Sequence, residues 1–313
     1  MKKLVSVLPF ILILAACGPQ ETAPPPPSAA ATKALDQPAQ PSAPTSASEL
    51  TGAKLDPILA GSWRSEENKA RDQYRHPKQT LEFFGVKPSD TLIEITPGGG
   101  WYAEILAPLM KGSGTYIAAI SKPRNPEGEA ARDQSALQKK FSADAAEYGE
   151  AKIVEFDSKA PNFGPAGSAD TVLTFRNVHN WVMGGNAPQM FKAFFDVLKP
   201  GGVLGVVDHR AAPGADLDKI KDSGYLPQDY VIKLATDAGF KLKAQSEINA
   251  NPKDTKDYEK GVWTLPPTFE LGDKDREKYA AIGESDRMTL KFVKAGGDEI
   301  FHQGADVGEP DKK

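Results

Sequence analysis

The sequence predicts an α/β fold in which a seven-stranded, mostly parallel sheet carries helices on both faces. Apolar strand patterns alternate with helical patterns for five rounds, and this alternation is typical of a parallel sheet. The last two strand patterns have no obvious helix between them, so they can pair as a terminal antiparallel hairpin. A glycine-rich turn directly after the first strand predicts a ligand site at one edge of the sheet.

Each expected strand is a short apolar or alternating run, and the helices between the strands carry apolar residues at helical spacing. The strands are expected at residues 91–95, 115–120, 152–156, 170–175, 203–207, 240–248 and 288–293. The helices are expected at residues 101–110, 130–148, 188–198 and 227–238, and a polar loop at 249–286. The helices at 101–110, 188–198 and 227–238 end at or just before glycines, because glycine is unfavourable inside a helix.

The segment before the first strand is mostly helix-forming. Residues 55–61 predict a short helical turn, and residues 62–84 a longer helix with Ser62 or Ser65 as its N-cap and Pro77 as a break or new start. Four residues spaced at i, i+4, i+7 and i+11 predict one basic helix face: Arg64, Asn68, Arg71 and Arg75. This face is either a solvated surface with local ion pairs or a lid, over residues 51–77, that binds an anionic acceptor or the carboxylate of a cofactor.

The N-terminus has the pattern of an export signal. A basic start is followed by an apolar run over residues 4–16, which is too short to span a membrane as a helix. Leu14-Ala15-Ala16-Cys17 resembles the bacterial lipobox, and the resemblance implies that Cys17 is lipidated and ends the signal peptide. An ordinary signal anchor is the alternative. Cys17 is the only cysteine, which excludes internal disulfides and cysteine-ligated metals.

Composition separates a tether from a globular domain. Residues 18–50 are rich in Pro, Ala, Ser and Thr and cannot bury a core, so we expect a disordered tether there. The main domain is expected at residues 78–295, followed by a polar tail at 296–313. The 313 residues have 40% apolar content and a net charge of -4, which is enough for a normal core and argues against nucleic acid as a partner.

The turn after the first strand carries the most informative motif. Glu94 ends the strand, and Gly98, Gly99 and Gly100 allow close approach of the backbone to a ligand. The chain here resembles class I S-adenosylmethionine-dependent methyltransferases, whose first motif is an acid followed by glycines two, four and six residues later. Thr96 stands at the first glycine position.

Further segments strengthen the resemblance. The phrase LKPGG at residues 198–202 is typical of the family. Five further segments together resemble a group of predicted exported bacterial methyltransferases: residues 71–77, 94–108, 176–181, 206–211 and 285–292. The resemblance implies a Rossmann-like methyltransferase fold over roughly residues 78–295 and S-adenosylmethionine as the cofactor. In such a sheet the ligand lies beyond the carboxyl ends of the strands, at the switch point in strand order.

The resemblance also implies a set of cofactor contacts. Glu94 would anchor the loop near the amino-acid part of the cofactor, and Asp157 would receive the adenine amino group. Ser121 stands where the family has an acid for the ribose hydroxyls, and this difference weakens the case for a nicotinamide dinucleotide as well. The cofactor set is Glu94, Thr96, Gly98, Gly99, Gly100, Trp101, Ser121, Asp157 and Asn177. For Glu94 the alternative is a structural carboxylate that caps the loop, and for Asp157 it is a turn residue at the end of a strand.

Three residues on the expected rim can carry catalysis. His179 is the first choice as a base, because imidazole titrates near neutral pH, and Asp208 and His209 follow the fifth strand. The alternative is hydrogen bonding within the loops. The sequence has no ligand pair such as HExxH, so we expect no metal. Trp101 and Trp181 lie on loops near the expected sulfonium, which aromatic faces can attract; packing in the core or at the rim is the alternative.

These features predict methyl transfer from S-adenosylmethionine to a small molecule by an exported protein that is lipid-anchored and faces the periplasm or the cell surface. The Asn/Asp-Pro-Pro-Tyr sequence of base-amino methyltransferases is missing, which argues against nucleic acid as the acceptor. A second hypothesis is a non-catalytic module that binds a nucleoside or another ligand on the cell envelope. Three observations favour this hypothesis. Export takes the protein away from the supply of the cofactor, Thr96 replaces the first glycine of the family motif, and Ser121 stands where the family has an acid for the ribose. A Rossmann oxidoreductase is a third.

Overall fold

A computed structural model describes residues 47–296. The signal peptide, Cys17, most of the expected tether and nearly all of the polar tail therefore lie outside the described residues. Within the described range, no helix combines the length and the apolar character that a membrane span requires.

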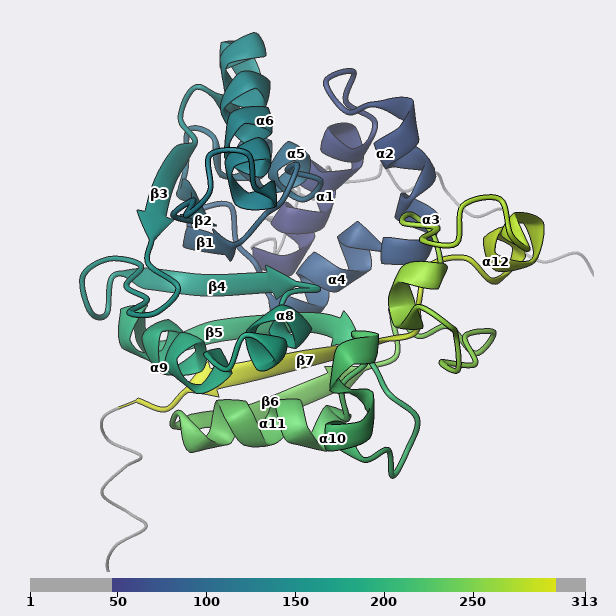
Figure 1. The fold of residues 1–313 in the computed structure, drawn as a ribbon. Helices are drawn as coiled ribbons and strands as arrows, with labels where there is room; N and C mark the ends of the chain where they lie inside the picture. The colour runs from purple at the N-terminus through teal and green to yellow at the C-terminus, as the bar shows by residue number, and fades with distance from the viewer. Residues whose placement is uncertain (1–46, 297–313) are drawn as a thin grey trace, which may run out of the picture. The chain divides into compact units, whose positions relative to one another are not determined.

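The centre of the fold is a seven-stranded sheet with the order β3-β2-β1-β4-β5-β7-β6 (Figure 1). Its strands are β1 (Thr91–Ile95), β2 (Thr115–Ser121), β3 (Lys152–Phe156), β4 (Ala169–Phe175), β5 (Leu198–His209), β6 (Phe240–Ser246) and β7 (Arg287–Lys294). The first five strands run parallel, and β7 lies antiparallel between β5 and β6. The predicted fold class is confirmed, and the strand order reverses between β1 and β4, where a ligand is expected.

Helices cover both faces of the sheet (Figure 1). Neighbouring residues of β1 point to opposite faces, as the period of a strand requires. Leu92 packs in a core with Leu81, Phe84, Leu106 and other residues from α1, α4, α5 and α6. Ile93 packs instead in the core formed by α8, α9 and α11. The helices before β4 are α1 (Ala47–Leu59), α2 (Glu66–Ala70), α3 (Asp72–Arg75), α4 (Pro77–Phe84), α5 (Ala103–Met110), α6 (Glu129–Ala143) and α7 (Ala145–Tyr148). Those after it are α8 (Val178–Met183), α9 (Ala187–Val197), α10 (Leu217–Ile220), α11 (Gln228–Asp237) and α12 (Arg276–Ile282), with 3-10 turns at Lys221–Ser223 and Gly261–Thr264.

The N-terminal segment agrees with the prediction at Ser65, which caps a helix, and at Pro77, where a new helix begins, but it has a further break at Arg71. The expected helix over residues 62–84 is divided into α2, α3 and α4. Ser65 caps α2 by accepting a hydrogen bond from the Asn68 amide at 3.2 Å. His76 ends α3 in a left-handed conformation with φ 41°, and Pro77 begins α4. The four expected positions are therefore divided among the loop before α2, α2 itself, the junction at Arg71 and α3.

The prediction also missed part of two other elements. The polar loop expected at 249–286 contains α12 and the turn at Gly261–Thr264. β5 begins five residues earlier than expected, because Leu198 already pairs with Ala169 before an irregularity in the register.

Candidate functional site

Two adjoining cavities lie at the predicted switch point. The smaller has a volume of about 200 Å³ and the larger of about 680 Å³. Both are lined by the same five residues from the carboxyl ends of β1 and β4: Thr96, Pro97, Gly98, Phe175 and Arg176. The glycine turn is therefore not filled by the protein's own side chains.

The turn itself is held in a conformation that usually needs glycine. Thr96 has φ 52°, and Gly98 and Gly100 have φ 57° and 82°. A left-handed backbone is unfavourable for a β-branched residue, which explains why the family motif has glycine at the position of Thr96. Asn177 fixes the turn by donating from Nδ2 to the carbonyl of Ile95 at 3.0 Å and that of Thr96 at 3.3 Å.

Glu94 forms part of the smaller cavity, although only 2% of it is exposed. Its Oε2 accepts a hydrogen bond of 2.6 Å from the hydroxyl of Tyr116. Burial raises the pKa of Glu94 to about 7, against the lowering effect of that hydrogen bond. A ligand cation placed in this cavity would stabilise the ionised carboxylate.

Arginines line the same cavity. Arg71 and Arg75 donate from Nε to the buried carboxylate of Glu284, at 2.7 and 3.1 Å, and Arg287 donates from Nη1 at 3.1 Å. Burial alone would raise the pKa of Glu284, but the surrounding guanidinium groups, Arg75 first, lower it to about 2. The Nη2 atoms of Arg71 and Arg75 are buried without a hydrogen-bond partner in the described part of the chain. They are thus available to an anion.

Arg64, expected in the lid, and Trp101, expected in the cofactor site, are both buried rather than facing solvent. Arg64 is only 1% exposed, and both of its terminal nitrogens bind Asp72, at 2.8 and 2.7 Å. It lines neither cavity, so it stabilises the loop before α2. Trp101 lines the smaller cavity, donates from Nε1 to the carbonyl of Asn68 at 3.0 Å, and has the Arg75 guanidinium 4.6 Å from its ring centre.

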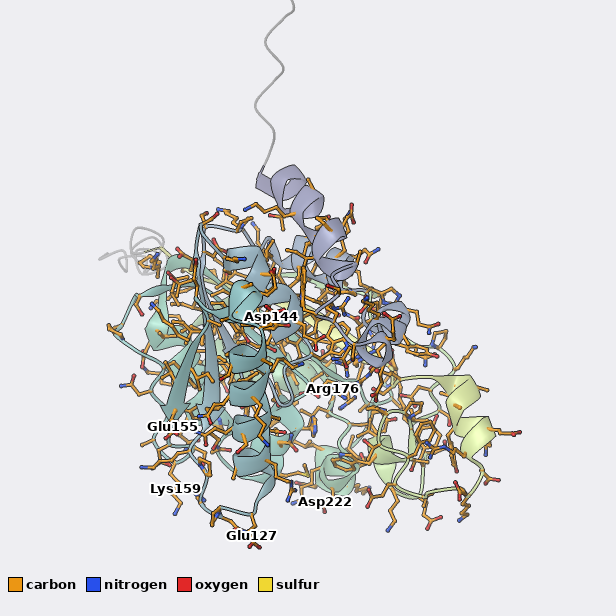
Figure 2. All side chains as sticks on the ribbon, turned by 90° about the horizontal axis from the view of Figure 1, so that it is seen from above. Glu127, Asp144, Glu155, Lys159, Arg176 and Asp222 are labelled. Carbon is orange, nitrogen blue, oxygen red and sulfur yellow. The ribbon has the colours of Figure 1, made fainter. Side chains whose placement is uncertain are left out.

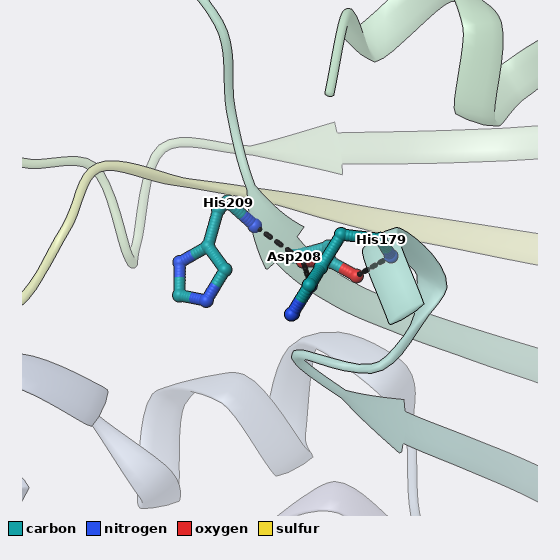
Figure 3. Close-up of side chains that lie close together, drawn as sticks. All are labelled: His179, Asp208 and His209. Atoms are coloured by element: carbon teal, nitrogen blue, oxygen red, sulfur yellow. Dashed lines mark hydrogen bonds and ion pairs between the residues drawn. The ribbon is translucent and has the colours of Figure 1, made fainter. Parts of the chain in front are cut away.

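The three expected catalytic residues come together at the ends of β4 and β5 (Figure 3). His179 Nδ1 lies 2.8 Å from Oδ1 of Asp208, whose side chain is fully buried. Asp208 also accepts from the backbone amides of His179, at 3.2 Å, and of His209, at 2.7 Å. Both imidazoles line the larger cavity, with ring centres 5.0 Å apart.

This geometry suits His179 to act as a base. A carboxylate beside Nδ1 favours the tautomer with the proton on Nδ1, which leaves the Nε2 lone pair free. The same carboxylate would stabilise the imidazolium after proton uptake. Burial, and then the charges of His179 and Arg176, hold the pKa of His209 well below its usual range, so His209 stays neutral. Its Nδ1 forms a hydrogen bond with Oγ of Ser285.

The same three residues offer ligand atoms within 4.8 Å of one another, which is close enough for a metal ion. Two features oppose this use. Asp208 already accepts the three hydrogen bonds described above, and the arginines that lower the pKa of His209 would repel a cation. The arrangement fits a base better than a metal centre.

Six expected site residues line neither cavity: Arg64, Gly100, Ser121, Asp157, Trp181 and Asp208. The Asp157 carboxylate is 60% exposed, accepts from the Lys159 amide at 2.9 Å and lies 3.9 Å from Arg124. Ser121 ends β2. Trp181 is buried in the core, with its ring centre 5.4 Å from that of Phe194. The contacts of Asp157 are those of a turn residue at the end of β3, and those of Trp181 are core packing.

The sequence also left several lining residues unassigned. Phe175 stacks on Tyr102 with ring centres 3.6 Å apart and forms part of the wall shared by both cavities. Trp263 lines the larger cavity from the region expected to be a loop, and its ring centre lies 6.0 Å from that of His179. Glu284 lies just before β7 and Arg287 lies within it. Arg71, Arg75 and Arg287, gathered around Glu284, form what we call the arginine cluster. Only the three-dimensional contacts identify these residues, because each is distant in sequence from its partners.

Comparison with known proteins supports the fold. No protein-family model and no curated protein sequence matches the chain. Among solved structures, the [4+2]-cyclase SpnF is 17% identical, with 82% of this chain and 98% of that chain covered and a TM-score of 0.50. An S-adenosylmethionine-dependent methyltransferase from Aquifex aeolicus is 13% identical, with 72% and 93% covered and a TM-score of 0.48. One from Mesorhizobium loti is 11% identical, with 75% and 99% covered and a TM-score of 0.43. At 17% identity the likeness to SpnF concerns the fold alone, and the strand order with its terminal antiparallel pair is that of the Rossmann-like methyltransferase fold.

Proposed function

We propose that this protein binds S-adenosylmethionine at the glycine turn and methylates a small molecule held in the larger cavity. The observation that carries the proposal is the lining of the smaller cavity. Glu94 offers a carboxylate, and Arg71 and Arg75 offer buried N–H groups without partners. These groups match the ammonium and the carboxylate of an amino acid, the two charged groups at the methionine end of the cofactor.

The volumes are consistent with the two cavities binding different parts of the cofactor and the acceptor. The smaller one, about 200 Å³, suits the amino-acid end, and the larger one, about 680 Å³, leaves room for the nucleoside and an acceptor. When bound, S-adenosylmethionine supplies a methyl group activated by its sulfonium. The protein's contribution is then to align the acceptor, exclude water and take up a proton where the nucleophile is a weak acid.

His179 is the residue best placed to take up that proton. It lines the larger cavity, and its Nε2 is free while Nδ1 faces Asp208. Asp208 holds the tautomer and offsets the charge of the imidazolium. This is a positioning role, since the fully buried Asp208 lines neither cavity.

Calorimetric titration of the purified chain with S-adenosylmethionine and S-adenosylhomocysteine tests the proposal. We expect both to bind, and Arg75→Met to weaken both by at least about tenfold, because a charge-assisted hydrogen bond is lost. Arg276→Met is the matched control, since Arg276 lies over the Phe269 ring, 4.0 Å from its centre, and lines neither cavity. Folded wild-type protein that produces no heat with either compound would overturn the assignment.

A second candidate is a module that binds a ligand without catalysis. Ser121 and Asp157 favour it, because residues at these family positions would hold the ribose and adenine, yet neither lines a cavity. Under this alternative, the chain would bind ligands at the arginine cluster with no preference for S-adenosylmethionine over an unrelated amino acid. Competition between the cofactor and an unrelated free amino acid, such as glycine, in the same titration separates the two.

We also propose, from the sequence alone, that the protein is exported and anchored through a lipid on Cys17. Labelling of bacterial cells with radioactive palmitate tests this. Label is expected in the wild-type protein and not in Cys17→Ser. Equal labelling of both would refute the anchor.

A further inference from the structure

The larger cavity carries a positive charge that the proposed cofactor does not explain. Arg176 lines both cavities from the end of β4. Its backbone has φ 61°, a left-handed conformation that is costly for a residue other than glycine. The Arg176 amide donates to the carbonyl of Val207 at 2.7 Å, so pairing with β5 fixes the residue there despite the strain. Figure 2 shows Arg176 amid the elements of the domain, whereas the labelled Glu127 and Lys159 lie at its edge.

The guanidinium of Arg176 has no hydrogen bond and no ion pair within residues 47–296. Each neighbouring arginine of the cluster has such a partner, since Arg71, Arg75 and Arg287 all donate to Glu284. Burial lowers the pKa of Arg176 to about 10, and Glu284 only partly offsets this effect. Arg176 therefore stays charged at neutral pH, and because it is partly buried and lines both cavities, its guanidinium can bind an anion there.

The charges around the two cavities do not balance. Four arginines, at positions 71, 75, 176 and 287, surround the carboxylate of Glu284, and Glu94 adds at most one further negative charge in the smaller cavity. A bound S-adenosylmethionine brings one carboxylate but also a sulfonium and an ammonium, so it adds positive charge. The negative charge of Asp208 is occupied by His179 and by two backbone amides. Asp133 also lines the larger cavity, but on the side of Gly98, where the cationic part of the cofactor is proposed to lie.

We infer that the methyl acceptor is an organic anion, a phosphate monoester or a carboxylate, whose charged group binds Arg176 in the larger cavity. This inference rests on the proposed function. The remaining lining suits the uncharged part of such a molecule, because Phe175, Val262, Trp263, Pro266 and Pro267 give the cavity an apolar wall. Trp263 and His179 are neighbours on that wall, so a flat acceptor packed against Trp263 would bring a polar atom near the proposed base.

The probe for this inference is phenyl phosphate, with benzoate as a weaker anion and benzyl alcohol as a neutral control. At pH 8 phenyl phosphate carries nearly two negative charges. Calorimetric titration of the full chain, saturated with S-adenosylhomocysteine, should give the affinity order phenyl phosphate, benzoate, benzyl alcohol. Anions that bind no better than benzyl alcohol would overturn the inference.

Variants assign the effect to Arg176. Arg176→Met is expected to lower the affinity for phenyl phosphate by about 10- to 100-fold and to leave that for benzyl alcohol unchanged. Arg176→Lys should recover part of the loss, and Arg276→Met should behave as wild type. The melting temperature of Arg176→Met should equal or exceed that of wild type, because an uncompensated charge is removed. A variant that keeps full preference for the anion would refute the role of Arg176.

The outcomes also separate this inference from the proposed function. Suppose that the wild-type protein does not bind the cofactor but binds phenyl phosphate without S-adenosylhomocysteine, and that Arg176→Met abolishes this binding. The anion site would then be supported, and the methyltransferase assignment would be refuted. Cofactor binding without anion preference would do the reverse.

Discussion

Replacing Glu94 by glutamine should remove a pH-dependent loss of stability. The substitution keeps the shape of the side chain and an oxygen for the Tyr116 hydroxyl, which lies 2.6 Å from Glu94. Burial raises the pKa of Glu94 to about 7 from an ordinary value of 4.5. A tenfold change in proton affinity corresponds to about 1.4 kcal/mol, so ionising this carboxylate in the folded state costs about 3 kcal/mol above pH 7.

The sign follows from the direction of the shift. An acid whose pKa is raised in the folded state stabilises the fold fully below pH 4.5, where it is protonated. This stabilisation is lost as the pH rises through 7. Between pH 5 and pH 8, the free energy of unfolding of the wild type should therefore fall by about 2 to 3 kcal/mol relative to Glu94→Gln. For a domain of this size, the corresponding difference in melting temperature is roughly 5 to 10 °C.

Urea unfolding of both proteins at pH 5, 6, 7 and 8 measures the effect directly. Glu66→Gln is the matched control, because the Glu66 side chain is 90% exposed and its pair with Lys69 lies on the surface. It should follow the wild type within about 0.5 kcal/mol. Parallel stability profiles for wild type and Glu94→Gln would show that burial does not raise the pKa of Glu94, and would refute the reasoning.

Three further substitutions test other parts of the site. Thr96→Gly should raise the free energy of unfolding by about 0.5 to 1 kcal/mol in urea, because relief of the left-handed strain at φ 52° outweighs the extra entropy of the unfolded glycine; a loss of stability would contradict this. Asp208→Asn should remove the fixed tautomer of His179, so the Nδ1 proton seen by nitrogen-edited NMR in the wild type should weaken or vanish; an unchanged signal would argue against Asp208 as the positioning group. Glu284→Gln should cost about 3 to 5 kcal/mol at pH 7, because it leaves buried guanidinium groups uncompensated. Since the pKa of Glu284 is lowered to about 2, its contribution is present above 4.5 and is lost as the pH falls through 2, so the difference in urea unfolding should shrink between pH 7 and pH 3; a difference that stays constant over this range would contradict the lowered pKa.

The sequence predicted the sheet well because its signals are local. The β3 strand, Lys152–Phe156, has the expected bounds, and β1 and the glycine turn follow from one uninterrupted motif. The break between α2 and α3 was missed, since helix propensity is similar on both sides of Arg71. What decides the break is a set of tertiary contacts that the sequence pattern does not contain.

The arginine cluster shows why part of the site escaped prediction. A basic stripe on a helix usually faces water, and only its partners can show that it is buried. Arg71 and Glu284 are 213 positions apart in the chain, and Arg75 and Glu284 are 209 apart. His179 and Asp208, by contrast, each follow a predicted strand, so their proximity could be anticipated from the rule that parallel strands end at one edge.

The contact between Glu284 and the N-terminal helices has a consequence for how the protein matures. Glu284 follows Arg75 by 209 residues and Arg287 follows Tyr74 by 213, so the residues that hold α3 are made long after it. A nascent chain that stops before β7 lacks both the antiparallel strand and the carboxylate that gathers the arginines. The proposed ligand site therefore cannot form before β7 has been made, and a fragment truncated before Glu284 should leave α3 unanchored even where the parallel strands have already paired.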